Sequence, residues 1–192
     1  MEVQVLEERS LPPLPRPNIC LAVSIPRFST FETIIEKSVE LGVHTLQPYF
    51  SDYSFVRDLA KIPEVKWERW QKILRGAAQQ SGRGALMELA KPLELKELLK
   101  TFNRKPKVGG LFPYEGEASF GVKTALEAIK GSESLEEFWV FVGSEGGFSL
   151  QEVAEFKASG LEPASLGPQV LRVETACVAL VSVIKYQFNL MA

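Results

Sequence analysis

Apolar stretches of strand length alternate along the chain with segments in which apolar residues recur every three or four positions. The first pattern predicts buried β-strands and the second predicts amphipathic α-helices. This alternation predicts an α/β fold with an open, mostly parallel sheet and helices on both of its faces. The predicted strands are 18–25, 43–50, 86–90, 108–112, 137–142 and 163–166, and the predicted helices are 29–41, 64–80, 93–102, 122–130, 149–160 and 173–190.

Two segments are apolar almost without interruption. Glu137–Val142 is predicted to be a strand inside the sheet, buried on both faces. Ala176–Ile184 is predicted to be a helix buried on every side. By contrast, four prolines within residues 11–17 exclude a helix or a central strand there. We therefore expect residues 1–17 to be a tail or the stub of a preceding domain, and residues 18–192 to form one domain.

The composition is typical of a globular protein that can bury a core. The chain has 192 residues, of which 45% are hydrophobic and 24% charged. Two cysteines and a single histidine exclude a disulfide framework and a Cys/His zinc site, so we expect no metal. The chain has no apolar run of membrane-spanning length and no leader pattern, which favours a cytoplasmic protein without membrane contact. We expect His44, early in a predicted strand, to be structural.

Charge is distributed unevenly along the chain. The net charge of -2 is made up of -3 over residues 1–53, +7 over residues 54–107 and -6 over residues 108–192. A basic middle segment is either a surface that binds a polyanion or a set of ordinary solvated helix faces. The charge alone leaves both interpretations open.

Two glycine-bearing loops, 143–148 and 166–172, each follow a predicted strand. In a parallel sheet the ligand crevice lies at the carboxyl ends of the strands, so we expect both loops at one site. Neither loop carries a phosphate-binding fingerprint, which excludes an ordinary Rossmann dehydrogenase. Glu145 in the first loop would repel phosphate. A carboxylate beside backbone groups freed by glycine suits a nucleoside-type cofactor without phosphates.

Four sequence blocks, in order, resemble one protein family. They are Ile35–Val43, Ala77–Arg83, Gly143–Glu152 and Leu166–Ala176. Together they are similar to the ribosomal RNA small subunit methyltransferase E family of SPOUT, or trefoil-knot, RNA methyltransferases. The resemblance implies an enzyme that methylates N3 of a uridine in small-subunit (16S) ribosomal RNA with S-adenosylmethionine. It also implies a deep trefoil knot at the C-terminus and a homodimer formed through that knot.

The resemblance also implies a cofactor site and a catalytic pair. Arg172 would stabilise negative charge on the uridine, and Glu174 would orient Arg172 or take the N3 proton. The alternative is an ion pair at the start of a helix that only shapes the loop. The implied cofactor-binding residues are Leu111, Phe112, Gly143, Glu145, Gly146, Gly147, Leu166, Gly167, Val170, Leu171 and Ala176.

Candidate RNA-binding residues lie in and just after the predicted helix 64–80. Gln80 and Arg83 match a block that faces the RNA in the family. The basic residues of the helix itself are predicted to contact phosphates without regard to sequence. These are Lys66, Arg69, Lys72 and Arg75.

The chain departs from the family in three places. Family members carry a PUA-like RNA-binding barrel before the methyltransferase domain, and we expect that barrel to be absent here. Tyr53 stands where the family has an RNA-facing arginine, and Ser144 replaces a proline, which is expected to loosen the turn. Two alternatives therefore stay open. They are a SPOUT methyltransferase of another RNA nucleotide and a non-catalytic RNA-binding or assembly protein of the same fold.

Overall fold

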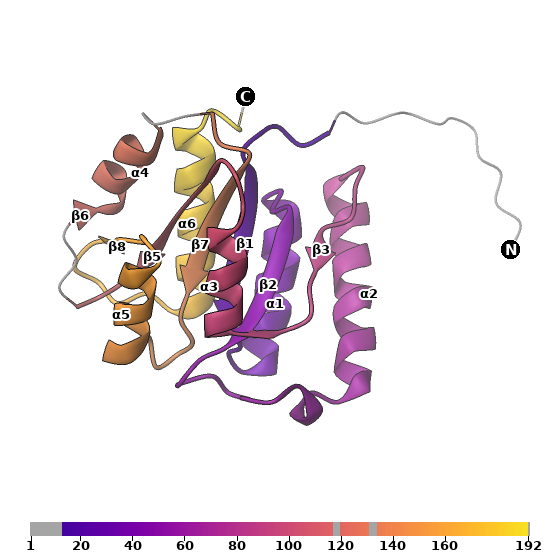
Figure 1. The fold of residues 1–192 in the computed structure, drawn as a ribbon. Coiled ribbons are helices and arrows are strands. Elements are labelled where there is room, and N and C mark those ends of the chain that lie inside the picture. The colour runs from indigo at the N-terminus through magenta and orange to yellow at the C-terminus, as the bar shows by residue number, and fades with distance from the viewer. Residues whose placement is uncertain (1–12, 117–119, 131–133, 192) are drawn as a thin grey trace, which may run out of the picture.

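A parallel sheet forms the centre of the computed structural model, which describes residues 13–116, 120–130 and 134–191 (Figure 1). Within these residues the strand order is β3-β2-β1-β7-β5-β8-β6, with β4 also paired to β2. Every pair is parallel, which confirms the predicted sheet. The strands are β1 (Asn18–Ser24), β2 (Thr45–Phe50), β3 (Glu88–Leu89), β4 (Leu93–Glu94), β5 (Val108–Pro113), β6 (Phe120–Gly121), β7 (Glu137–Val142) and β8 (Pro163–Ser165).

Helices cover both faces of the sheet, as predicted. Side chains of α1, α2, α4 and α6 share one apolar core with one face, and those of α3 and α5 share a second core with the other. The α-helices are α1 (Phe28–Glu40), α2 (Glu64–Ser81), α3 (Leu95–Asn103), α4 (Val122–Lys130), α5 (Leu150–Ala158) and α6 (Val173–Gln187). Three short elements are missing from the sequence prediction because they are too short to show periodicity: β4, β6 and the 3-10 turn η1 (Leu59–Lys61).

Strand β7 lies between β1 and β5 in the middle of the sheet. Its side chains alternate between the two cores. Phe138, Val140 and Val142 join the core under α1 and α6, whereas Trp139 and Phe141 join the core under α3 and α5. The prediction of a strand buried on both faces is therefore confirmed.

Helix α6 differs from its prediction. Its inner side is buried in the core, but Val183 is 37% exposed and Tyr186 is 77% exposed. The prediction that Ala176–Ile184 is buried on every side is therefore wrong for a single chain. An apolar pattern predicts that the side chains of a helix are buried, but it does not show whether the same chain or a second molecule buries them.

Two predictions about the chain ends remain open. Of the predicted tail at 1–17, residues 1–12 lie outside the described residues, and residues 13–17 form neither helix nor strand. The deep trefoil knot stays a prediction.

At the amino end of β7, the Glu137 carboxylate accepts hydrogen bonds from three side chains. Lys105 Nζ lies 2.8 Å from Oε1, while Trp139 Nε1 and Cys20 Sγ lie 2.7 and 3.8 Å from Oε2. Burial alone raises the pKa of Glu137, but the hydrogen bonds from Lys105 and Trp139 outweigh it and hold the pKa below its ordinary value. This carboxylate ties the end of α3 to the central strand.

The pKa of Glu137 is lower in the folded chain than in the unfolded chain, so the ionised carboxylate stabilises the fold. This stabilisation is complete at pH values above the ordinary carboxyl pKa. It is lost as the pH falls through the pKa that Glu137 has in the folded chain. We expect Glu137→Gln to lower the free energy of unfolding by about 1 kcal/mol at neutral pH, and by much less at strongly acidic pH. Urea denaturation at the two pH values measures this difference. Glu136→Gln, which removes only an exposed contact to Arg16, is the matched control. An equal loss at both pH values for Glu137→Gln contradicts the prediction.

Candidate functional site

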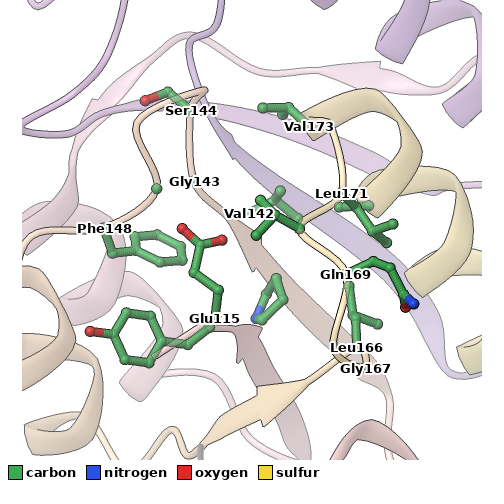
Figure 2. Close-up of a pocket in the computed structure, with 15 residues that line it drawn as sticks. Glu115, Val142, Gly143, Ser144, Phe148, Leu166, Gly167, Gln169, Leu171 and Val173 are labelled. Carbon is green, nitrogen blue, oxygen red and sulfur yellow. The ribbon is translucent and has the colours of Figure 1, made fainter. Parts of the chain in front are cut away.

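A cavity opens at the carboxyl ends of β5, β7 and β8 (Figure 2). It measures about 590 Å³, counting the part open to solvent. Both glycine-bearing loops contribute to it, which confirms that they meet at this edge of the sheet. The lining residues are Pro113, Tyr114, Glu115, Val142, Gly143, Ser144, Gly147, Phe148, Leu166, Gly167, Gln169, Val170, Leu171, Val173 and Ala176.

The loop after β7 is a tight turn that needs glycine at two positions. Gly147 N donates to Ser144 O at 2.9 Å and closes the turn. Gly147 has a φ of +70°, a backbone conformation that other residues adopt only with strain. A Cβ on Gly143 would lie 2.9 Å from the carbonyl oxygen of Gly147. The backbone of this turn can therefore approach a ligand closely.

Hydrogen bonds tie this turn to the segment after β2. Ser144 Oγ donates to the carbonyl of Tyr53 at 2.6 Å, and Ser149 Oγ donates to Asp52 Oδ2 at 2.6 Å. The Glu152 carboxylate accepts from Asp52 N at 2.9 Å and from Ser149 N at 2.8 Å. Ser149 and Glu152 also form a capping box at the start of α5. The Ser144 hydroxyl makes a contact that proline cannot make, and the expected loosening of the turn stays a prediction.

The loop between β8 and α6 forms one apolar wall of the cavity. Gly167, with a φ of +112°, donates its N–H to Ser165 Oγ at 3.1 Å, and its carbonyl accepts from the same hydroxyl at 3.4 Å. In Figure 2, Leu166 and Leu171 lie on one side of the cavity and Phe148 lies on the other. A flat apolar ring would be contacted on both of its faces by such walls.

Glu115 is the one acidic or basic side chain among the described residues that line the cavity. Its carboxylate points into the middle of the ring of lining residues in Figure 2. A Cβ on Gly147 would lie 3.1 Å from Glu115 Oε1, so the carboxylate reaches the glycine turn. The cavity therefore favours a ligand with a positively charged group.

Seven of the predicted cofactor residues line the cavity: Gly143, Gly147, Leu166, Gly167, Val170, Leu171 and Ala176. The other four do not line it. Leu111 and Phe112 are buried in β5, just before the lining segment begins. Glu145 accepts a hydrogen bond from the backbone N–H of Arg27 at 3.1 Å, and Gly146 packs against Tyr53. The carboxylate of the cavity is therefore Glu115 and not Glu145.

Sequence reasoning missed the last residue of β5 and the two residues that follow it. Pro113, Tyr114 and Glu115 all line the cavity, but no glycine motif marks them. The usable signal is position alone, since a residue that directly follows a parallel strand lies at the carboxyl edge. Phe148 and Gln169 lie within the two recognised loops and could have been included on the same ground.

Arg172 and Glu174 have different surroundings. Arg172 is exposed at the N-cap of α6, between the lining residues Leu171 and Val173. Glu174 lines a small cavity against α1, together with Lys37. In the part of the chain that the structure describes, no ion pair joins Arg172 to Glu174. Their catalytic roles stay predictions.

Two of the four basic residues of α2 that were predicted to contact phosphates form ion pairs within the chain. Lys66 Nζ and Arg69 Nε lie 3.2 and 2.8 Å from the Glu32 carboxylate of α1. Lys72 and Arg75 are exposed. The charge that α2 can offer to a polyanion is therefore smaller than the sequence suggests.

Gln80 and Arg83 lie at the other end of α2, near the amino edge of the sheet. Arg83 Nη1 donates to Val39 O at 3.5 Å, and partial burial lowers the pKa of Arg83. His44 is at this edge too, with Nδ1 3.0 Å from Thr45 Oγ1. None of these three residues lines the cavity.

Among residues 13–116, 120–130 and 134–191, no helix is long and apolar enough to cross a membrane. In the same ranges, no group of three or more His, Cys, Asp or Glu side chains could hold a metal ion.

Comparison with known proteins gives a consistent family. The model of the RNA methyltransferase domain matches residues 12–185. Ribosomal RNA small subunit methyltransferase E from Aquifex aeolicus is 32% identical over 175 residues, and that from Bacillus subtilis is 33% identical over 190 residues. These matches cover 89% and 96% of this chain, and 69% and 70% of the relatives.

A crystal structure of the corresponding Neisseria gonorrhoeae methyltransferase, bound to S-adenosyl methionine, superposes with a TM-score of 0.74 at 28% identity. The match covers 89% of this chain and 66% of that one, so the chain spans about two thirds of the length of these proteins. The family match covers most of the chain and includes both loops of the cavity. The chain therefore belongs to the ribosomal RNA small subunit methyltransferase E family of RNA methyltransferases.

Proposed function

We propose that the cavity of Figure 2 binds S-adenosylmethionine and that this chain methylates N3 of a uridine in small-subunit ribosomal RNA. The observation that carries the proposal is the cavity itself. It is built by the two loops that relate the chain to a family of ribosomal RNA methyltransferases. A ribosomal RNA substrate also supports the cytoplasmic location expected from the sequence.

The lining residues fit S-adenosylmethionine in three respects. Leu166, Leu171 and Phe148 offer apolar walls for an adenine ring. The glycine turn offers backbone groups to the polar edge of the ring, and the Glu115 carboxylate offers a negative charge to a sulfonium or amino group. The bound cofactor supplies a methyl group on a positively charged sulfur. None of the described residues that line the cavity is basic, which agrees with a ligand that carries no phosphate.

The protein's own contribution is to position the uridine and to stabilise its charge. N3 lies on the Watson–Crick edge and carries a proton, so the base must be unpaired and must lose that proton to a base. Arg172, exposed between the lining residues Leu171 and Val173, is the proposed group that stabilises the resulting negative charge on the uracil ring. Glu174 remains the proposed proton acceptor, although its position against α1 favours Arg172 as the residue that meets the substrate.

We expect Arg172→Ala to reduce methyl transfer by roughly 100-fold or more, because it removes the group that stabilises the developing charge. The assay uses labelled S-adenosylmethionine and small ribosomal subunits that lack the modification, followed by nucleoside mass spectrometry for 3-methyluridine. Glu174→Gln, measured in parallel, tests whether this carboxylate takes the proton. Lys157→Ala, on the exposed side of α5, is the control.

Unchanged transfer by both variants contradicts the proposed roles of Arg172 and Glu174. A different methylated nucleoside supports the alternative of another RNA specificity. If cofactor and RNA both bind but no methyl group is transferred, the non-catalytic alternative holds.

The Glu115 carboxylate gives a separate prediction about the cofactor. We expect Glu115→Gln to weaken binding of S-adenosylmethionine by roughly 10-fold, because a charge-assisted contact is lost. Binding of S-adenosylhomocysteine, which lacks the sulfonium charge, is expected to change less. Calorimetric titration with both ligands measures the difference, and Glu162→Gln on the exposed surface before β8 is the control. Equal weakening of both ligands contradicts an interaction with the sulfonium.

We also propose that the chain forms a homodimer through α6. The outer side of this helix carries an uncharged stripe made up of Thr175, Val178, Ala179, Ser182, Val183 and Tyr186, all partly or fully exposed in the single chain. The exposed side of a helix on a monomer normally carries charged residues. An uncharged stripe on an otherwise apolar helix supports burial against a second copy.

We expect Val183→Glu to convert the dimer to a monomer, because it places an unpaired charge in the centre of the proposed contact. Sedimentation velocity measures the mass of each species. Leu86→Glu, at an exposed apolar position between α2 and β3, is the matched control and should leave the dimer intact. A wild-type chain that sediments as a monomer contradicts the proposal outright.

A further inference from the structure

Two aromatic side chains are exposed on the segment that follows β2. We call residues 51–57 the aromatic loop. Within it Tyr53 is 49% exposed and Phe55 is 54% exposed. Single exposed apolar residues are common, but two aromatic rings on one short loop form a surface that can bind a ligand.

The aromatic loop is held firmly by buried serines. Ser24 Oγ lies 2.6 Å from Ser51 Oγ and 2.9 Å from Ser54 Oγ. Ser51 N donates to Ser54 Oγ at 2.8 Å, and Phe55 N donates to the carbonyl of Ile25 at 2.8 Å. All three serines are buried. The two rings are therefore presented on a fixed backbone, so a ligand would bind them at little cost in loop entropy.

The loop lies directly beside the cavity. Ser144, a lining residue, donates to the carbonyl of Tyr53. The Tyr53 side chain packs on the glycine turn, where a Cβ on Gly146 would lie 2.8 Å from Tyr53 Cβ. Phe55 contacts Phe28 at the start of α1, edge to face, with 5.4 Å between ring centroids. A nucleotide next to a target uridine held beside the bound cofactor would therefore lie near these rings.

Two arginines lie close to the rings along the sequence, and Arg57 lines a second cavity that also contains the carboxylates of Asp52, Glu94 and Glu155. Arg57 follows Phe55 by two positions, and Arg27 precedes Phe28. Both side chains are exposed, and neither is paired with an acidic side chain in the described part of the chain. Aromatic rings for stacking beside cations for phosphates are what single-stranded nucleic acid surfaces combine.

We propose that the aromatic loop binds an unpaired base adjacent to the target nucleotide, with Tyr53 stacked on that base and Arg27 and Arg57 on the neighbouring phosphates. The inference rests on the proposed function in two respects: the substrate is RNA, and its target nucleotide lies beside the cofactor cavity. Tyr53 is then a specificity-determining residue, because the base beside the target must be free of pairing before it can stack. Phe55 extends the same surface toward α1.

The test is a binding measurement that needs no methyl transfer. The full chain is titrated into a short oligouridylate that carries one 2-aminopurine, whose fluorescence falls when it stacks. We expect the wild type to bind and quench. Tyr53→Ala should weaken binding by roughly 10-fold and remove the quenching, and Tyr53→Trp should restore both. Tyr53→Leu, which keeps apolar area without a ring, should behave like Tyr53→Ala.

Controls separate stacking from other causes. Leu86→Ala, an exposed apolar position elsewhere, should bind like the wild type. With a fully abasic oligonucleotide of the same length, wild type and Tyr53→Ala should bind equally, since no base remains to stack on the ring. Light scattering of Tyr53→Ala reports whether the loop instead joins two chains.

Several outcomes overturn the inference. They are no binding by the wild type, equal binding by wild type and Tyr53→Ala, or loss of dimer mass in Tyr53→Ala. Failure of the proposed function gives a different result. Tyr53-dependent binding without any methylated nucleoside in the transfer assay rejects the methyltransferase while the stacking surface stands.

Discussion

One buried carboxylate holds together the loops on which the candidate site depends. Glu152 is 4% exposed, and its two oxygens accept hydrogen bonds from the backbone of the segment after β2 and from the start of α5. A buried charge is tolerated only when donors surround it, so both segments must stay in place for the carboxylate to remain satisfied. The glycine turn lies between them and is fixed from both sides. The shape of the cavity thus follows from a requirement of electrostatics and not from apolar packing alone.

The parallel sheet explains why so much chemistry gathers at one edge. Where a strand ends at the carboxyl edge, the backbone N–H and C=O groups of the following loop no longer hydrogen-bond within the sheet. Residues of the loops after β5, β7 and β8 line the cavity at this edge. Helix α6 serves this arrangement in three ways. Its N-terminus lines the cavity, its inner side completes the core, and its outer side carries the uncharged stripe.

Much of this architecture could be predicted from the sequence because long elements carry periodic signals. Glu137–Val142 and Val122–Lys130 have the predicted bounds, and the capping box of Ser149 is present. What failed depends on contacts between distant segments. The direction of Glu145 toward Arg27 and the exposure of the outer side of α6 leave no trace in local spacing. Glu115 was not predicted because it belongs to no recognisable motif. Only its position directly after a strand could have indicated that it lines the cavity.

The pairing of Lys66 and Arg69 with Glu32 changes how the basic middle of the chain acts on a polyanion. These two cations neutralise a carboxylate of the neighbouring helix, so a nucleic acid would have to compete with Glu32 for them. Counterion release grows with the number of phosphates neutralised, and paired cations add little to it. The affinity of α2 for RNA should therefore depend less steeply on salt than the count of its basic residues implies.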